Sequence, residues 1–86
     1  MEPLDGNAIA GTLYDAFGTE MTTATGRCAN CGTTRQLAET RVYLRAPGTV
    51  VRCATCGAVL LVLVEIRGYM CVDARGLDAL EMTQAT

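Results

Sequence analysis

The sequence predicts a small metal-stapled α+β protein, in which one N-terminal amphipathic helix packs on an antiparallel sheet. Three observations lead to this class. The pattern RCxxCG occurs twice, at residues 27–32 and 52–57. Short β-rich segments separated by turn signals surround both copies, and an apolar stripe of helical period precedes them. A chain of 86 residues also buries only a modest core, so a bound metal is a common staple at this size.

The first element is a helix over residues 5–17. Asp5 suits its N-cap, and Gly18 suits the left-handed position that follows a helix. Apolar side chains recur every four residues, as in a helix that docks on a core; they are Ile9, Leu13 and Phe17. We therefore expect this helix to cover the sheet.

The strand patterns in residues 19–53 differ in clarity from one segment to the next. Residues 19–27 are β-branched and alternating, which predicts a strand that leads into the first CxxC. Residues 33–39 give no decisive pattern. Residues 40–53 predict a hairpin with Pro47 and Gly48 at the centre of a type II turn.

The second half begins with a strongly apolar segment. Residues 58–66 are apolar on both faces, which predicts a strand central in its sheet and covered by the helix. Arg67 and Gly68 form a turn into a last strand over 69–74. The spacing of Leu77 and Leu80 then predicts a short helical turn over a sheet edge. We expect a single domain with these parts: helix 1–18, sheet 19–75 with knuckles at 28–32 and 53–57, and a short turn with a frayed tail at 76–86.

The two CxxC motifs predict a metal site. Two residues between cysteines allow both sulfurs to reach one tetrahedral ion from a single tight turn. A glycine follows each motif and permits a positive φ, so that backbone N–H groups approach the sulfurs. The predicted ligands of one Zn²⁺ are Cys28, Cys31, Cys53 and Cys56. The fold is accordingly an antiparallel zinc ribbon of four to five strands with the N-terminal helix.

Iron stays open as an alternative metal. Tetrahedral sites with four sulfurs accept zinc or iron, and CxxCG knuckles are also typical of rubredoxin-like electron carriers. Rubredoxins pack a dense aromatic core, whereas this chain has no Trp, one Phe and three Tyr. A thioredoxin-like motif is disfavoured because a strand, not a helix, follows the second glycine. Zinc is therefore the favoured ion.

The metal is predicted to be structural, and the protein is predicted not to be an enzyme. Four thiolates close the coordination shell, whereas a catalytic zinc keeps one position for water or substrate. The chain has no histidine, the commonest general base, and shows no motif for a small-molecule substrate. The fifth cysteine, Cys71, is interpreted as a buried apolar filler of the last strand, with a redox-active thiol as the alternative.

One strand face is a candidate binding surface. By the strand period of two, Arg41, Tyr43 and Arg45 share a face. In one register Arg52 lies across from Tyr43, within cation–π reach. Such a face suits a protein partner or the phosphates and bases of a nucleic acid. Residues 26–68 carry six Arg and two Glu, but four thiolates around Zn²⁺ would reduce their net charge to about +2. This weak charge favours a protein partner.

The sequence predicts a cytoplasmic protein with no membrane segment. Its first residues are acidic and lack the basic and apolar regions of a signal peptide. The longest apolar run, residues 58–64, is too short to span a bilayer. In a reducing compartment, paired CxxC motifs bind metal more often than they form disulfides.

The chain resembles a family of short actinobacterial zinc-ribbon proteins of unknown function. The resemblance rests on MEPLDGNAIAGTL, the two CxxC motifs, YLRAPG and DARGL, and extends over nearly the whole chain. It implies a ribbon with an N-terminal helix and the same four cysteine ligands, and it implies no mechanism. We expect a non-catalytic adaptor that binds a protein partner through its sheet surface, with nucleic-acid binding as the alternative. A sheet face that the helix leaves uncovered would also allow a homodimer.

Overall fold

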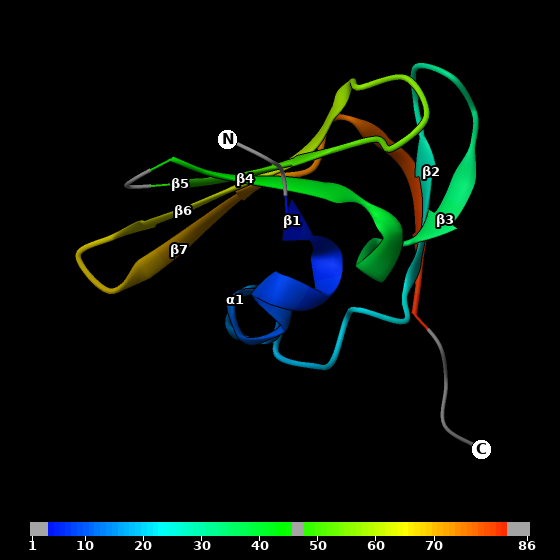
Figure 1. Ribbon diagram of the computed structural model, residues 1–86. Helices are drawn as coiled ribbons and strands as arrows, with labels where there is room; N and C mark the ends of the chain where they lie inside the picture. The colour runs from blue at the N-terminus through cyan, green and yellow to red at the C-terminus, as the bar shows by residue number, and fades with distance from the viewer. Residues whose placement is uncertain (1–3, 46–47, 83–86) are drawn as a thin grey trace.

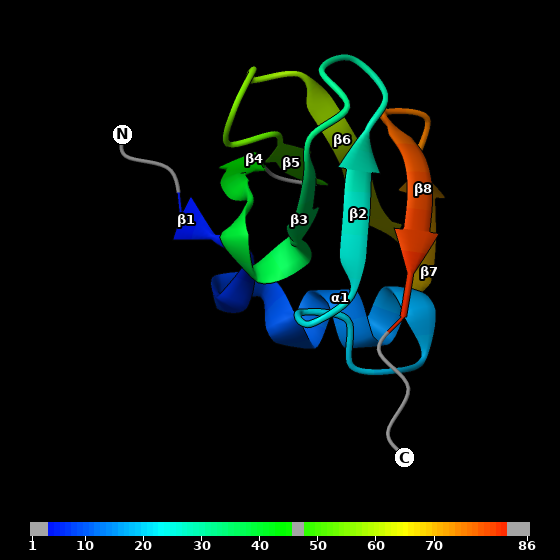
Figure 2. The same cartoon turned by 90° about the vertical axis from the view of Figure 1, so that its right-hand side faces the viewer.

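The computed structural model describes residues 4–45 and 48–82. It contains two antiparallel sheets, with strand orders β1-β4-β5-β6-β7 and β3-β2-β8, and the helix α1 beneath the larger one (Figures 1 and 2). This confirms the predicted small α+β class with one N-terminal helix. The elements in chain order are β1 Leu4–Asp5, η1 Gly6–Ile9, α1 Ala10–Phe17, β2 Thr25–Cys28, β3 Thr34–Gln36, η2 Leu37–Glu39, β4 Arg41–Arg45, β5 Gly48–Arg52, β6 Val59–Ile66, β7 Tyr69–Asp73 and β8 Leu77–Glu81.

The N-terminal helix has the predicted caps but begins as a 3₁₀ turn. The Asp5 carboxylate accepts a hydrogen bond from the Asn7 N–H at 3.1 Å. Gly18 ends α1 with a φ of 75°, and its N–H donates to the Tyr14 carbonyl at 2.7 Å. These bonds satisfy orphan backbone groups at both ends of the helical segment.

Gly6 lies where the first helical turn meets η2. A Cβ at this position would lie 1.7 Å from the Leu37 carbonyl oxygen, so only glycine allows the two segments to approach this closely. Because η2 directly follows β3 and precedes β4, this contact fixes the N-terminal segment at the junction between the two sheets.

The core lies between the larger sheet and the helix. Strand registers align the inward side chains in rows, one of which joins Val42, Val51 and Leu61. These side chains are at most 1% exposed, and Ile9 and Leu13 of the helical segment cover them as predicted. The prediction that β6 is buried on both faces is wrong for its outer face. That face lies opposite α1 and leaves its valines half-buried.

Residues 19–24 do not form the predicted strand, which starts only at Thr25. The Glu20 carboxylate accepts hydrogen bonds from the Thr22 N–H at 2.7 Å and from the Thr22 hydroxyl. Side chains that bond to nearby backbone in this way compete with sheet formation, which explains why the β-branched run forms a turn. The undecided segment 33–39 contains β3 and η2.

The β4–β5 and β6–β7 hairpins of the larger sheet follow the prediction in outline. Arg45 pairs with Gly48, so Gly48 belongs to β5 and not to the centre of the turn; Pro47 lies outside the described residues. Between β6 and β7, Arg67 and Gly68 have φ values of 51° and 82°. Two such residues form the tight turn that matches strand twist, as predicted for this position.

The last described segment is a strand and not the predicted helical turn. β8 pairs with β2, and its register skips Asp78 between Arg27 and Cys28. This bulge turns Leu77 and Leu80 toward the same side although they are three residues apart. A strand with a bulge therefore imitates the helical spacing that the sequence shows. The tail that was predicted to fray, residues 83–86, lies outside the described residues.

Candidate metal centre

Each CxxC motif forms the turn of a β-hairpin. The first joins β2 to β3, and the second joins β5 to β6. The Cys28 N–H donates to the Thr33 carbonyl at 3.0 Å, and the Cys53 N–H donates to the Ala58 carbonyl at 2.8 Å. The two knuckles thus have the same hydrogen-bond pattern and come from different sheets.

The glycine after each motif has the backbone conformation that the sequence predicted. Gly32 and Gly57 have φ values of 76° and 80°, and their N–H groups donate to the carbonyls of Cys28 and Cys53 at 2.8 and 2.9 Å. No atom lies within 4 Å of a Cβ built at either glycine. The glycines are therefore needed for backbone conformation and not for space.

The four predicted ligands meet at one point. The Sγ atoms of Cys28, Cys31, Cys53 and Cys56 all lie within 4.8 Å of one another. The closest pairs across the two knuckles are Cys28–Cys56 at 3.6 Å and Cys31–Cys53 at 3.7 Å. In a tetrahedral site with metal–sulfur bonds of about 2.3 Å, sulfurs are about 3.8 Å apart. The cluster is compatible with one metal ion held by both sheets.

The cluster has a buried side and an exposed side. Cys28 and Cys53 are buried, whereas Cys31 and Cys56 are exposed. Polar groups surround the sulfurs: Cys56 Sγ accepts from the Asn30 amide at 3.4 Å, Cys53 Sγ accepts from the Thr55 N–H at 3.4 Å, and Cys31 Sγ lies 3.2 Å from the Thr33 hydroxyl. Donors of this kind orient metal ligands and stabilise their charge. Sequence reasoning did not identify Asn30 and Thr33, although both lie within two residues of a cysteine.

Two of the clustered cysteines, Cys31 and Cys56, have lowered pKa values, whereas the pKa of Cys28 is raised. The Thr33 hydroxyl, together with the Thr33 N–H, lowers the pKa of Cys31 to about 6. The Asn30 amide lowers the pKa of Cys56. The pKa of Cys28 is raised; the Cys31 N–H opposes this shift, but burial and the neighbouring sulfurs outweigh it. Cys31 is therefore largely a thiolate at neutral pH, which is the form that binds metal.

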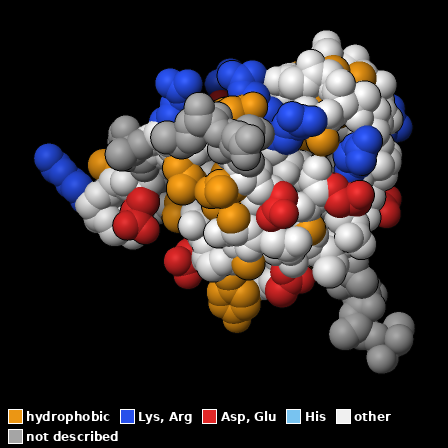
Figure 3. Space-filling view, in the orientation of Figure 1, with side chains coloured by type: hydrophobic (Ala, Val, Ile, Leu, Met, Phe, Trp, Pro, Cys, Tyr) orange, Lys and Arg blue, Asp and Glu red, His pale blue; other side chains and the backbone are white. Residues whose placement is uncertain are grey.

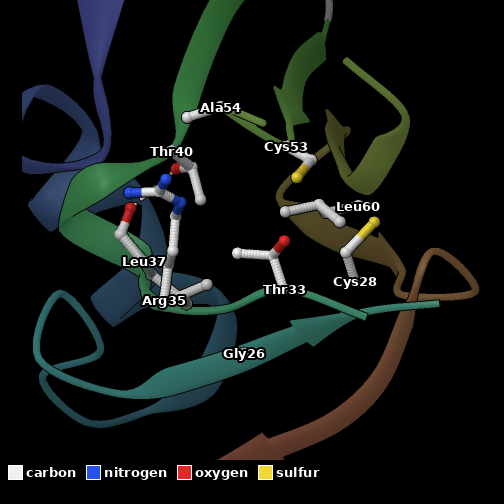
Figure 4. Close-up of a pocket in the computed structure, with 9 residues that line it drawn as sticks. All are labelled: Gly26, Cys28, Thr33, Arg35, Leu37, Thr40, Cys53, Ala54 and Leu60. Carbon is white, nitrogen blue, oxygen red and sulfur yellow. Dashed lines mark hydrogen bonds between the residues drawn. The ribbon is translucent and has the colours of Figure 1, made fainter. Parts of the chain in front are cut away.

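A small pocket lies between the sheets beside the buried sulfurs (Figure 4). Cys28 and Cys53 line one side of it, Arg35 lines the other, and Leu60 closes it toward β6. The volume open to the centre of a water molecule is about 10 Å³, which is room for one water. At the rim, Arg35 donates to the Thr55 hydroxyl at 3.2 Å and thereby links β3 to the second knuckle.

The larger sheet presents one face away from α1, which we call the outer face. The predicted proximity of Arg52 to Tyr43 is present, but Arg52 lies opposite Arg41 and not opposite Tyr43. The Arg52 guanidinium lies 5.8 Å from the centre of the Tyr43 ring. In Figure 3, basic side chains gather on the upper side of the molecule, over β4 and β5. The strand registers assign to the outer face Arg41, Tyr43, Arg45, Val50, Arg52, Val59, Val62, Val64, Ile66, Tyr69, Cys71 and Asp73.

The position of Cys71 differs from the prediction. Its side chain is exposed on β7, whereas the sequence predicted a buried filler. The reason is that β7 is an edge strand, and Cys71 alternates onto the open outer face while its neighbours Met70 and Val72 point toward the helix side. Packing against the core is left to Met70.

Within residues 4–45 and 48–82, no helix has the length and apolarity that a bilayer crossing needs.

Comparison with known proteins identifies one family. No curated protein and no solved structure matches the chain. A family model described as "Family of unknown function (DUF6510)" matches residues 1–85. The doubled knuckle and the sheets that carry it thus occur in a chain that belongs, over almost its full length, to the family of unknown function DUF6510.

Proposed function

We propose that this protein is a non-catalytic, zinc-stabilised adaptor that binds a protein partner through its outer face. The observation that carries the proposal is the contrast between the two faces of the larger sheet. Inward side chains such as Val51 and Leu61 are at most 1% exposed. On the outer face, Val50, Val62 and Val64 stay half-buried, and no described element covers them. An apolar strip framed by charge is typical of an interaction surface.

Zinc is the proposed ion, with a structural role. Four thiolates at tetrahedral spacing suit Zn²⁺ and leave no open coordination position for a substrate. This agrees with the resemblance to short actinobacterial zinc-ribbon proteins and with a reducing cytoplasm. Elemental analysis with a visible spectrum tests it. One zinc per chain in a colourless protein is expected, whereas iron with charge-transfer bands would replace the adaptor by a rubredoxin-like electron carrier.

The chemistry of the outer face indicates the kind of partner. Arg41, Arg45 and Arg52 lie on one side of the valine strip, and Tyr43 stands among them. Arginine and tyrosine are enriched where protein interfaces concentrate their binding energy. A partner segment with apolar side chains over the strip and carboxylates opposite the arginines would match this face.

Site-specific photo-crosslinking in cells tests the location. A photoreactive residue replaces Val62 on the outer face or, as a matched control, exposed Thr34 on the smaller sheet. The protein captured only from position 62 is then purified, and its affinity is measured directly. Substituting Arg41→Glu and Arg45→Glu should weaken binding at least about tenfold, and charge reversal on the partner should restore it. Equal capture from both positions, or an affinity that charge reversal leaves unchanged, would refute the proposal.

Nucleic-acid binding is the second candidate, and the stacked pair favours it. A guanidinium over a tyrosine ring beside two further arginines is an arrangement that also serves single-stranded nucleic acids. This function predicts binding of a labelled single-stranded oligonucleotide that weakens steeply with added salt. Binding that survives high salt or the double substitution Arg41→Glu and Arg45→Glu would exclude this face as a phosphate-binding surface.

A further inference from the structure

The larger sheet ends in a strand whose outer edge is open. β7 pairs with β6 alone, and in Figure 2 it forms one margin of the sheet above α1. Proteins usually protect such edges with short strands, bulges, charged residues or proline. This strand has no proline, its register is regular, and its one charged residue is Asp73 at its end. Tyr69 is 76% exposed and Val72 is 39% exposed.

The other edge strands that the structure describes are protected. β1 has only two residues. β3 has three residues and carries Arg35. β8 contains the bulge at Asp78, inside the strand. The open edge of β7 is thus a local exception within a fold that otherwise protects its edges.

The turn before β7 determines which backbone groups point outward. Tyr69 closes the two-residue turn opposite Ile66, so its N–H points toward β6. Directions alternate along an antiparallel strand, so Cys71 also bonds toward β6. Met70 and Val72 therefore direct their N–H and C=O groups toward the open edge.

We propose that a second copy of this chain pairs with this edge, antiparallel, about a two-fold axis at Cys71. Met70 of each copy then exchanges two hydrogen bonds with Val72 of the other. Cys71 lies opposite itself in a non-hydrogen-bonded pair, where facing side chains come closest. The result is one continuous sheet through both copies, with the two outer faces on the same side.

The exposed apolar side chains of the edge fit this pairing. In the proposed register Tyr69 of one copy lies opposite Asp73 of the other, and the Asp73 carboxylate is paired with Arg75 of its own chain at 2.7 Å. Pairing also shields the exposed Tyr69 and Val72 from water, and a self-complementary edge of this kind is what a two-fold dimer requires. This dimer would form with or without a partner bound to the outer face.

Sedimentation velocity of the metal-loaded protein tests the dimer. The wild type should be dimeric at high micromolar concentration. Val72→Pro removes an outward N–H without touching a bond to β6, and Val72→Lys places a charge at the edge. Each should weaken association at least about tenfold. Thr34→Lys, on the protected edge of β3, should leave it unchanged. A monomeric wild type, or a dimer that survives both substitutions at Val72, would overturn the proposal. If the proline variant fails to fold, the lysine variant decides.

Covalent trapping tests the register. Diamide takes two hydrogen atoms from two thiols and leaves one disulfide. Mild treatment of the metal-loaded protein should give a covalent dimer that Cys71→Ser abolishes, while that variant still sediments as a dimer. A non-covalent dimer with no bond through Cys71 would place the interface elsewhere and overturn the two-fold axis proposed here.

Discussion

The two sheets contribute to the core in different ways. The larger sheet supplies Val42, Val51, Leu61 and Leu63, all fully buried between this sheet and the helix. In the smaller sheet, whose strands are described throughout, the buried side chain is Cys28, a predicted metal ligand. Hydrophobic packing therefore explains the larger sheet. In the smaller sheet, apolar packing against the core comes from the partly buried Leu77 and Leu80, and we expect the four-cysteine centre to supply the remaining stability when it holds a metal.

Removing a buried cysteine ligand should cause the largest loss of stability. Cys28→Ser should abolish metal binding and unfold the smaller sheet, because structural metal sites contribute on the order of 10 kcal/mol. Metal content and thermal unfolding measure the change. Cys71→Ser, which alters an exposed thiol outside the cluster, is the matched control and should retain the metal. A metal-free Cys28→Ser protein with wild-type unfolding would contradict this expected role of the metal.

Truncating one leucine in each sheet should show how much apolar packing contributes to the stability of that sheet. Leu61 is fully buried in the larger sheet, whereas Leu80 of the smaller sheet is half-buried. Leu61→Ala should lower the free energy of unfolding by about 2–5 kcal/mol, and Leu80→Ala by about 1 kcal/mol. Urea unfolding of the metal-loaded proteins gives both values. Equal losses would show that the smaller sheet has an apolar core of its own.

The junction between the sheets can be tested at Gly6. An added methyl group would overlap the Leu37 carbonyl, so Gly6→Ala should destabilise the protein by about 2–3 kcal/mol. Gly11→Ala is the matched control on α1, because nothing lies within 4 Å of its added Cβ. It should stabilise the helix by about 0.5–1 kcal/mol. Similar melting temperatures for the two variants would argue against the close approach at Gly6.

The smallest expected effect comes from breaking the ion pair between Arg75 and Asp73, where the chain passes from β7 to β8. Hydrogen bonds from the Arg75 side chain lower the pKa of Asp73 to about 2. Because this pKa is depressed, the stabilisation is present above the ordinary value of 3.8 and is lost as pH falls toward 2. Both groups are exposed, so we expect a small change in stability. In an NMR titration, Arg75→Ala should return the Asp73 midpoint to near 3.8; an unchanged midpoint would contradict the assignment.

The metal centre was the part of the molecule most directly predictable from sequence. Ligand spacing and the glycines after each motif depend on local backbone geometry, so Cys28 and Cys53 could be assigned to one site without the fold. The N-terminal helix was also predictable, since Asp5 and Gly18 act through local hydrogen bonds. These features can be predicted without knowing which residues far apart in the sequence are in contact.

The second sheet could not be predicted, because its elements depend on tertiary pairing. The bulge at Asp78 gives β8 a helical spacing of leucines, and Glu20 turns a β-branched run into a loop. The exposure of Cys71 follows from the position of β7 at a sheet edge, which strand order determines. Sequence patterns predicted the joint face of Arg41 and Tyr43, but not that this face is the uncovered side of the sheet.

Hydrogen exchange of the protein before and after metal removal tests whether the smaller sheet depends on the cysteine centre. We expect exchange to accelerate strongly in residues 25–36 and 77–81, while the buried strand around Leu61 and Leu63 keeps most of its protection. Loss confined to the smaller sheet would show that the cysteine centre holds that sheet in place. Unchanged protection in both sheets after complete metal removal would contradict the account, because packing alone would then sustain the whole fold.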